Sequence, residues 1–198
     1  MLNFGGVCKQ FLLNCLDNPR LNQMIQYSLR PIQKHKTVLK NILRKIPYTA
    51  ALDYGCGEGF FADCFTPDKY LGFDFNPRRI AYAQKHFSRY SFTARKPDFR
   101  KFDLLLFNNV WHHLKAAQIK NLLRGLAAGQ IALLELKPPN EQRGIFFKLI
   151  LWLEAKTHYS QPRTAVFYIE LLRRRGFVLW QSRDLGRFFL QLYCFRKV

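Results

Sequence analysis

One segment, residues 50–59, constrains the fold of this chain more than any other. It reads AALDYGCGEG, so a short apolar run that ends in Asp53 passes directly into glycines at positions 55, 57 and 59. Glycine adopts positive φ angles readily and has no Cβ to keep another molecule away from the backbone. These glycines are therefore expected where a strand ends, the chain turns sharply and a ligand approaches the turn.

The spacing of the glycines separates this loop from two other nucleotide-binding loops. A dinucleotide fingerprint has the pattern GxGxxG, but here the third glycine comes one residue early and Phe60 stands in its place. The loop that binds nucleoside triphosphates needs a Lys followed by Ser or Thr, whereas Glu58 and Phe60 stand here. A nicotinamide or nucleoside triphosphate site is thus disfavoured.

Apolar runs alternate with amphipathic stretches along the chain, which predicts an α/β fold with a mostly parallel sheet and helices on both faces. Strands are expected over residues 49–54, 69–75, 102–107 and 130–136. Helices are expected over residues 59–65, 77–87 and 115–126, and around the helically spaced Leu39, Ile42, Leu43 and Ile46. Near the C-terminus, the strand-like runs 177–182 and 188–195 suit an antiparallel pair.

The domain organisation is predicted to be simple, because no internal repeat, low-complexity tract or linker divides the chain. A single domain is expected over residues 1–198, made of N-terminal helices (1–47), a ligand-binding core (48–136), an insertion (137–163) and a C-terminal helix with the strand pair (164–198). The insertion contains an apolar stretch, 145–153, which suits either an ordinary core helix or a lid over the ligand.

Two further segments place polar side chains at the ends of expected strands. Asp74 follows the second strand, nineteen residues after Gly55, where a carboxylate can accept both hydroxyls of a ribose. The segment 102–114 reads FDLLLFNNVWHHL and brings Asn and His side chains to the same edge. Because ligands of open α/β sheets bind outside the carboxyl ends of the strands, these residues indicate an adenosine-containing ligand.

Together these segments resemble the class I S-adenosylmethionine-dependent methyltransferases, in the branch with the motifs LDxGCGxG, GxDxNPxxIxxA and FDLxxxNxVxHHL. The resemblance runs from about Leu52 to Leu136 in motif order and continues more loosely to the C-terminus. It implies a Rossmann-like, seven-stranded sheet whose last strand is antiparallel, with S-adenosylmethionine as the cofactor and no metal requirement.

The resemblance also implies which residues contact the cofactor and which could assist the reaction. The implied contacts are Asp53, Gly55, Cys56, Gly57 and Gly59 around the methionine part, Asp74 at the ribose, Phe75 and Asn76 at the adenine, and Asn109 and Val110 beside the sulfonium. His112 and His113 are candidates for a base, which is needed only if the acceptor must lose a proton. The acceptor atom could be oxygen, nitrogen or carbon of a small, amphipathic or lipid-like molecule.

One departure from the family concerns the adenine. Members often carry an acidic residue after the third strand, but residues 91–96 read SFTARK and offer Ala94 and a basic pair instead. This departure keeps open an alternative, a catalytically silent protein that binds the cofactor on the same fold.

The charge of the chain leaves a second alternative open. There are 32 Lys and Arg against 13 Asp and Glu, a net charge of +19, and the 16% of aromatic residues exclude disorder as its cause. A basic surface favours polyanions, here RNA or an anionic membrane face. An RNA-modifying methyltransferase is therefore the alternative to a small-molecule enzyme, although the fourth strand ends in Asn108-Asn109-Val110-Trp111 and not in an NPPY-type tetrad.

The expected location is the cytoplasm, with peripheral attachment to a membrane left open. The five cysteines are odd in number and include no CxxC pair, and the first nineteen residues lack the features of a secretory signal. No apolar run approaches the ~18 residues that a membrane span needs. The sequence makes no prediction of the oligomeric state.

Overall fold

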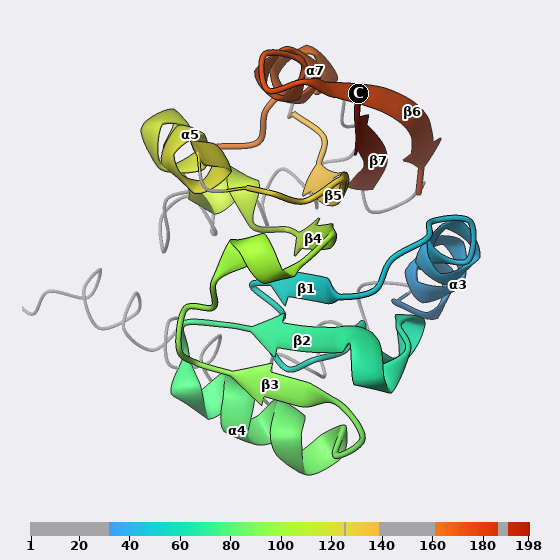
Figure 1. Cartoon of the computed structure of the whole chain (residues 1–198), viewed down its shortest axis with the longest axis vertical. Helices are drawn as coiled ribbons and strands as arrows, with labels where there is room; N and C mark the ends of the chain where they lie inside the picture. The colour runs from blue at the N-terminus through green and yellow to red at the C-terminus, as the bar shows by residue number, and fades with distance from the viewer. Residues whose placement is uncertain (1–31, 125, 139–160, 186–189) are drawn as a thin grey trace, which may run out of the picture.

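The computed structural model describes residues 32–124, 126–138, 161–185 and 190–198, and its centre is one seven-stranded sheet (Figure 1). The strand order is β3-β2-β1-β4-β5-β7-β6. The strands are β1 (Ala51–Tyr54), β2 (Tyr70–Phe73), β3 (Ser91–Thr93), β4 (Leu104–Asn108), β5 (Gln130–Leu136), β6 (Phe177–Asp184) and β7 (Leu190–Lys197).

The first five strands are parallel, and β7 inserts between β5 and β6 antiparallel to both. This arrangement confirms the predicted Rossmann-like sheet of seven strands with an antiparallel last strand. The first four residues of β4, 104–107, are fully buried, as expected of a strand covered on both faces.

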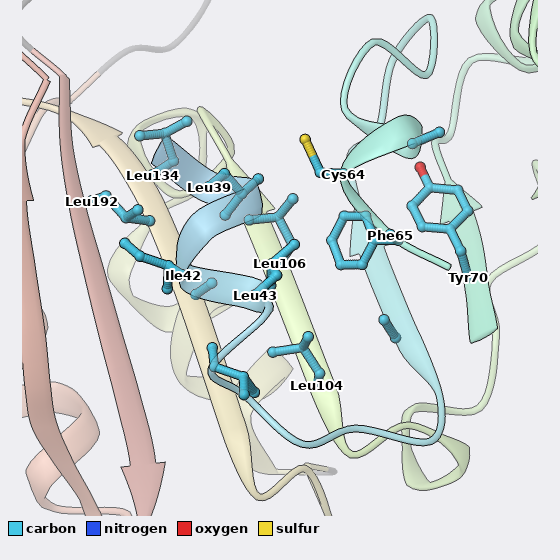
Figure 2. Packing of buried hydrophobic residues seen from close by; sticks show 14 of the residues in the cluster. Leu39, Ile42, Leu43, Cys64, Phe65, Tyr70, Leu104, Leu106, Leu134 and Leu192 are labelled. Carbon is cyan, nitrogen blue, oxygen red and sulfur yellow. The ribbon is translucent and has the colours of Figure 1, made fainter. Parts of the chain in front are cut away.

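Helices cover both faces of the sheet, as predicted. On one face lie α3 (Ile32–Leu43) and α4 (Pro77–His86), and on the other α5 (Ala116–Arg124) and α7 (Ala165–Arg173). Successive residues of β4 alternate between the two cores, Leu104 and Leu106 on the α3 face and Leu105 and Phe107 on the α5 face. Figure 2 shows how the inner side of α3 meets the sheet at Leu104, Leu106, Leu134 and Leu192.

The prediction of a helix over residues 59–65 is wrong, because only a 3-10 turn, η1 (Ala62–Cys64), forms there. Seven residues are too few for a stable helix, and a second 3-10 turn, η2 (Pro67–Lys69), begins almost at once with proline, which favours extended backbone before it. The neighbouring α3 covers this part of the sheet, and its Lys36 is paired with Asp63 at 2.7 Å. Tertiary packing thus replaces a local helix.

The predicted insertion, including the apolar stretch 145–153, lies almost wholly outside the described residues. Among the helices that are described, none is long and apolar enough to span a bilayer.

Candidate functional site

The glycine loop leaves β1 at the carboxyl edge of the sheet and is held against β2. The backbone N–H groups of Gly55 and Cys56 both donate to the carbonyl of Phe73, at 2.7 and 3.0 Å. Gly55, Gly57 and Gly59 all have positive φ angles, of 78°, 53° and 79°. The backbone therefore needs glycine at each of the three positions.

The surroundings of these glycines differ. A Cβ at Gly55 would lie 2.5 Å from Cγ2 of Val110, because the Val110 side chain packs directly on the loop. A Cβ at Gly57 would find only a guanidinium nitrogen of Arg79, at 3.9 Å. A Cβ at Gly55 thus has no room, while a Cβ at Gly57 would meet only the end of a flexible side chain, although Gly57 itself is buried.

This difference predicts opposite outcomes for two alanine variants. Gly55→Ala is expected to lower the free energy of unfolding by about 2 to 4 kcal/mol, since backbone strain adds to overpacking. Gly57→Ala should lower it by only about 1 kcal/mol, but should weaken binding of any ligand that contacts the loop. Urea unfolding and ligand titration of both variants measure the two effects. Equal destabilisation would contradict the packing of Val110 on Gly55.

Asp74 connects the loop to the end of β2. Its Oδ2 accepts from the backbone N–H of Gly57 at 3.0 Å, and its Oδ1 accepts from the N–H of Asn76 at 2.8 Å. Each carboxylate oxygen keeps lone-pair capacity for another donor. The half-buried side chain is therefore fixed in position and can still accept hydroxyl groups from a ligand.

Asp53 is the most perturbed acid of the site. Its side chain is 1% exposed, and its Oδ2 accepts from the Tyr70 hydroxyl at 3.0 Å, while Oδ1 is buried with no hydrogen-bond partner among the described residues. Burial raises the pKa of Asp53 to about 7, with a smaller contribution from the charge of Asp74 and an opposing one from the Tyr70 hydrogen bond. A buried acceptor atom without a partner suits a cationic ligand group.

Asn109 and Val110 follow β4 at the same edge. Asn109 has a φ of 57°, unusual for a residue other than glycine, and its N–H donates to the carbonyl of Leu134 at 2.7 Å. Its side-chain Nδ2 donates to Oδ1 of Asn108 at 2.9 Å, while its own Oδ1 is buried and unpaired within the described part of the chain. This backbone conformation turns the chain from β4 across the glycine loop.

Glu135 holds the next turn in place, and the sequence reasoning missed it. This carboxylate of β5 has no exposed surface; its Oε1 accepts from the N–H groups of Val110 and Trp111, at 2.9 and 2.7 Å. Its Oε2 accepts from the N–H of His112 at 3.4 Å and lies 2.6 Å from His112 Nδ1. A charged residue inside the apolar run 130–136 is the sequence feature that could have revealed it.

Arg163 holds the same turn from its carbonyl side. The guanidinium donates to the carbonyls of Trp111 and Leu114, at 2.7 and 2.6 Å, and lies over the Phe167 ring at 4.9 Å. The side chain is largely buried. The sequence contains no pattern that distinguishes Arg163 from the other arginines, so only the structure reveals it.

The two histidines occupy different environments. His112 is 1% exposed and in contact with Glu135 through Nδ1, while His113 is exposed; their ring centroids are 4.0 Å apart. The Glu135 contact favours a positioning role for His112. The roles of both histidines as bases stay predictions.

The remaining predicted residues lie beside Asp74. Asn76 is the N-cap of α4, and its side chain accepts from the N–H of Arg78 at 3.0 Å. The Phe75 ring is 67% exposed and lies edge-on to Phe73 and Tyr54, with centroids 4.7 and 6.1 Å away. Ala94 directly follows β3, so the position where related proteins often have an acid carries none.

The structure thus brings the predicted cofactor residues together at the carboxyl ends of β1, β2 and β4. Asp74, and Asp53 when it is ionised, give this edge negative charge in a protein with a net charge of +19. Oδ1 of Asp53 and Oδ1 of Asn109, which have no hydrogen-bond partner among the described residues, fit an S-adenosylmethionine-like group, which carries an ammonium and a sulfonium.

Comparisons with known proteins agree with this geometry. A family profile described as a methyltransferase domain matches residues 24–182. No curated protein matches the sequence.

Several solved structures share the fold at low sequence identity. Human N-acetylserotonin methyltransferase, in complex with S-adenosylmethionine, is 22% identical, with a TM-score of 0.60, over 76% of this chain and 48% of that one. The pyocyanin biosynthetic protein PhzM is 16% identical, with a TM-score of 0.69, over 96% of this chain and 61% of that one. Magnesium protoporphyrin IX methyltransferase from Synechocystis, with bound S-adenosylhomocysteine, is 12% identical, with a TM-score of 0.66, over 96% and 99%.

The chain therefore spans about half to three fifths of the length of the first two proteins and nearly all of the third. The family profile covers most of the sequence. The chain belongs to this methyltransferase domain family and has the class I fold of S-adenosylmethionine-dependent methyltransferases.

Proposed function

We propose that the protein binds S-adenosylmethionine and transfers its methyl group to a small or amphipathic molecule. The observation that carries the proposal is the pair of acids at the glycine loop. Asp74 is fixed by Gly57 and Asn76, and Asp53 has a buried oxygen with no partner among the described residues. The family membership and the ligands of the solved relatives support the same cofactor.

Each acid has a distinct role in holding the cofactor. Asp74 accepts the two ribose hydroxyls with the lone pairs that its backbone bonds leave available. Asp53 places negative charge beside the methionine part, at the end of β1. Phe75 offers an exposed ring next to Asp74 for the adenine, which compensates in part for Ala94.

The reaction needs alignment more than acid–base chemistry. When bound, S-adenosylmethionine supplies a methyl group on a positively charged sulfur. An acceptor atom attacks the methyl carbon in line with the sulfur, which leaves as a neutral thioether. The protein contributes orientation and a dry surface. Asn109 and Val110 provide that surface, because Glu135 and Arg163 fix the turn that carries them.

The test of cofactor binding is Asp74→Ala. Removing two charge-assisted hydrogen bonds to the ribose is expected to weaken S-adenosylhomocysteine binding about thirtyfold. Asp68→Asn serves as the matched control, since Asp68 is exposed in η2 before β2 and should leave binding within about twofold. Isothermal titration measures the affinity of both variants for S-adenosylhomocysteine. If Asp74→Ala binds it as tightly as the wild type, the proposed site is wrong.

The test of turnover distinguishes the alternatives. Purified protein is incubated with S-adenosylmethionine that carries a labelled methyl group, and with extracts that contain either small molecules and lipids or RNA. Label in the small-molecule or lipid fraction supports the proposal. Label confined to RNA would favour the RNA-modifying alternative, and cofactor binding without any labelled product would favour the silent one.

A further inference from the structure

A hollow lies at the opposite edge of the sheet from the glycine loop. It has a volume of about 360 Å³ and opens between the end of α3 and the turn before β2. Its lining residues 46–48 precede β1, and 64–66 and Lys69 precede β2, whereas Gly55 and Asp74 follow those strands. The length of the strands therefore separates this hollow from the proposed cofactor site.

The rim of the hollow is basic. Lys40 comes from α3, Arg44 directly follows α3 and Lys69 comes from η2; all three are exposed. Within the described part of the chain, no carboxylate lines the hollow. The nearest turn of α3 differs, because Lys36 is paired with Asp63 at 2.7 Å. Among the described residues, neither Lys40, Arg44 nor Lys69 is paired with a carboxylate.

This clustering of charge is unfavourable without an anion. Lys40 and Arg44 lie one helical turn apart, where like charges repel. The C-terminal dipole of α3 favours cations in its last turn, but it does not account for Lys69, which reaches the same hollow from another element. A bound anion would offset the repulsion among all three.

The floor of the hollow is apolar, with one polar group at its side. The floor consists of Leu43, Ile46 and Phe65, each at most 5% exposed. Figure 2 shows Leu43 on α3 and Phe65 across from it. The Tyr48 hydroxyl accepts from the N–H of Thr66 at 3.3 Å, so its own proton remains available to a ligand. Lys69 lies 6.0 Å above the Tyr48 ring.

We propose that this hollow binds a phosphate-bearing group of a small amphipathic molecule. Three cations and a hydroxyl donor match the two charges and several acceptor oxygens of a phosphomonoester better than the single charge of a carboxylate. The apolar floor holds the carbon atoms next to the phosphate. The phosphate is that of a free phosphoester or of a phospholipid headgroup, and this site is independent of methyl transfer.

The experiment compares two charge-matched double variants. The hollow variant combines Lys40→Ala and Lys69→Ala and so removes two cations from the hollow. The control variant combines Lys34→Ala on α3 and Lys85→Ala on α4, and removes two exposed cations that do not line the hollow. Glycerol 1-phosphate binding is measured by isothermal titration. Vesicle binding is measured by co-sedimentation with phosphatidylcholine, with and without phosphatidic acid.

The hollow variant is expected to bind the phosphomonoester at least about tenfold more weakly than the wild type, and the control variant within about twofold. Binding of glycerol 1-phosphate indicates a free phosphoester as the source, and binding of phosphatidic acid vesicles alone indicates a lipid headgroup. The proposal is wrong if both double variants lose affinity equally or if the wild type binds neither glycerol 1-phosphate nor the vesicles. It is also wrong if the protein binds an RNA oligonucleotide that phosphate does not displace. Binding of S-adenosylhomocysteine should stay within about twofold in both variants, which separates this outcome from failure of the cofactor site.

Discussion

Replacing Glu135 with alanine is expected to lower the free energy of unfolding by about 3 to 5 kcal/mol. The carboxylate is fully buried and accepts from three consecutive backbone N–H groups and from the His112 ring. Alanine would leave these donors without an acceptor in a site that water does not reach. Buried donors without acceptors each cost about 1 to 3 kcal/mol, so the loss exceeds that of one ordinary hydrogen bond.

The same change should also weaken cofactor binding, because Val110 is one of the three residues that Glu135 holds. Val110 packs on Gly55, so movement of the turn loosens the glycine loop from the side. Urea unfolding and titration with S-adenosylhomocysteine measure the two effects. In Glu135→Gln, the amide oxygen can still accept from the backbone, so an intermediate loss of about 1 to 2 kcal/mol is expected.

Glu170→Ala is the matched control. Glu170 lies half exposed on α7 and is paired with Arg173 and Arg174 at 3.5 Å, so its loss should change the free energy of unfolding by less than about 0.5 kcal/mol. If Glu135→Ala were no more destabilising than this control, the buried carboxylate would not be what holds the turn after β4.

The core strands could be predicted because burial on both faces gives apolar runs with clear ends. The prediction for residues 130–136 coincides with β5. The prediction for 49–54 begins too early, since the N–H groups of Thr49 and Ala50 donate to the carboxylate of Asp103 and not to a neighbouring strand. A side chain 53 or 54 positions away decided this boundary, and a local pattern does not contain such information.

The predicted cofactor residues could be found because they lie in or shortly after the last residues of a strand, where the topology brings them to one edge. Glu135 and Arg163 could not be found in this way, because they bind the backbone of residues 110–114 from β5 and from the chain before α7. In each case the missing information is a long-range contact.

Asp53→Asn is expected to change stability and cofactor affinity in opposite directions at pH 8. In the folded protein the pKa of Asp53 is about 7, above its ordinary value of 3.8, because the carboxyl is buried. The folded state therefore holds the proton more tightly than the unfolded state. The stability that this provides is fully present below pH 4 and is lost as the pH rises through 7.

At pH 8 the folded wild type thus contains a buried charge. The rise in the pKa corresponds to a decrease of up to about 4 kcal/mol in the free energy of unfolding. Asparagine carries no charge and can still accept from the Tyr70 hydroxyl, but its amide N–H groups lack the acceptors they need. The net gain in the free energy of unfolding is therefore expected to be about 2 kcal/mol at pH 8 and to vanish near pH 4.

Cofactor affinity should respond in the opposite sense, because only the ionised carboxylate attracts the positive charges of S-adenosylmethionine. The wild type is expected to bind about tenfold more tightly at pH 8 than at pH 6, as Asp53 loses its proton, and Asp53→Asn should bind about a hundredfold more weakly at pH 8. Titration of the ligand itself affects both proteins alike, so the difference between their pH profiles isolates Asp53. If the affinity of both proteins changes with pH in the same way, the charge of Asp53 does not contribute to cofactor binding. If Asp53→Asn is less stable than the wild type at pH 8, the charge of Asp53 does not destabilise the fold.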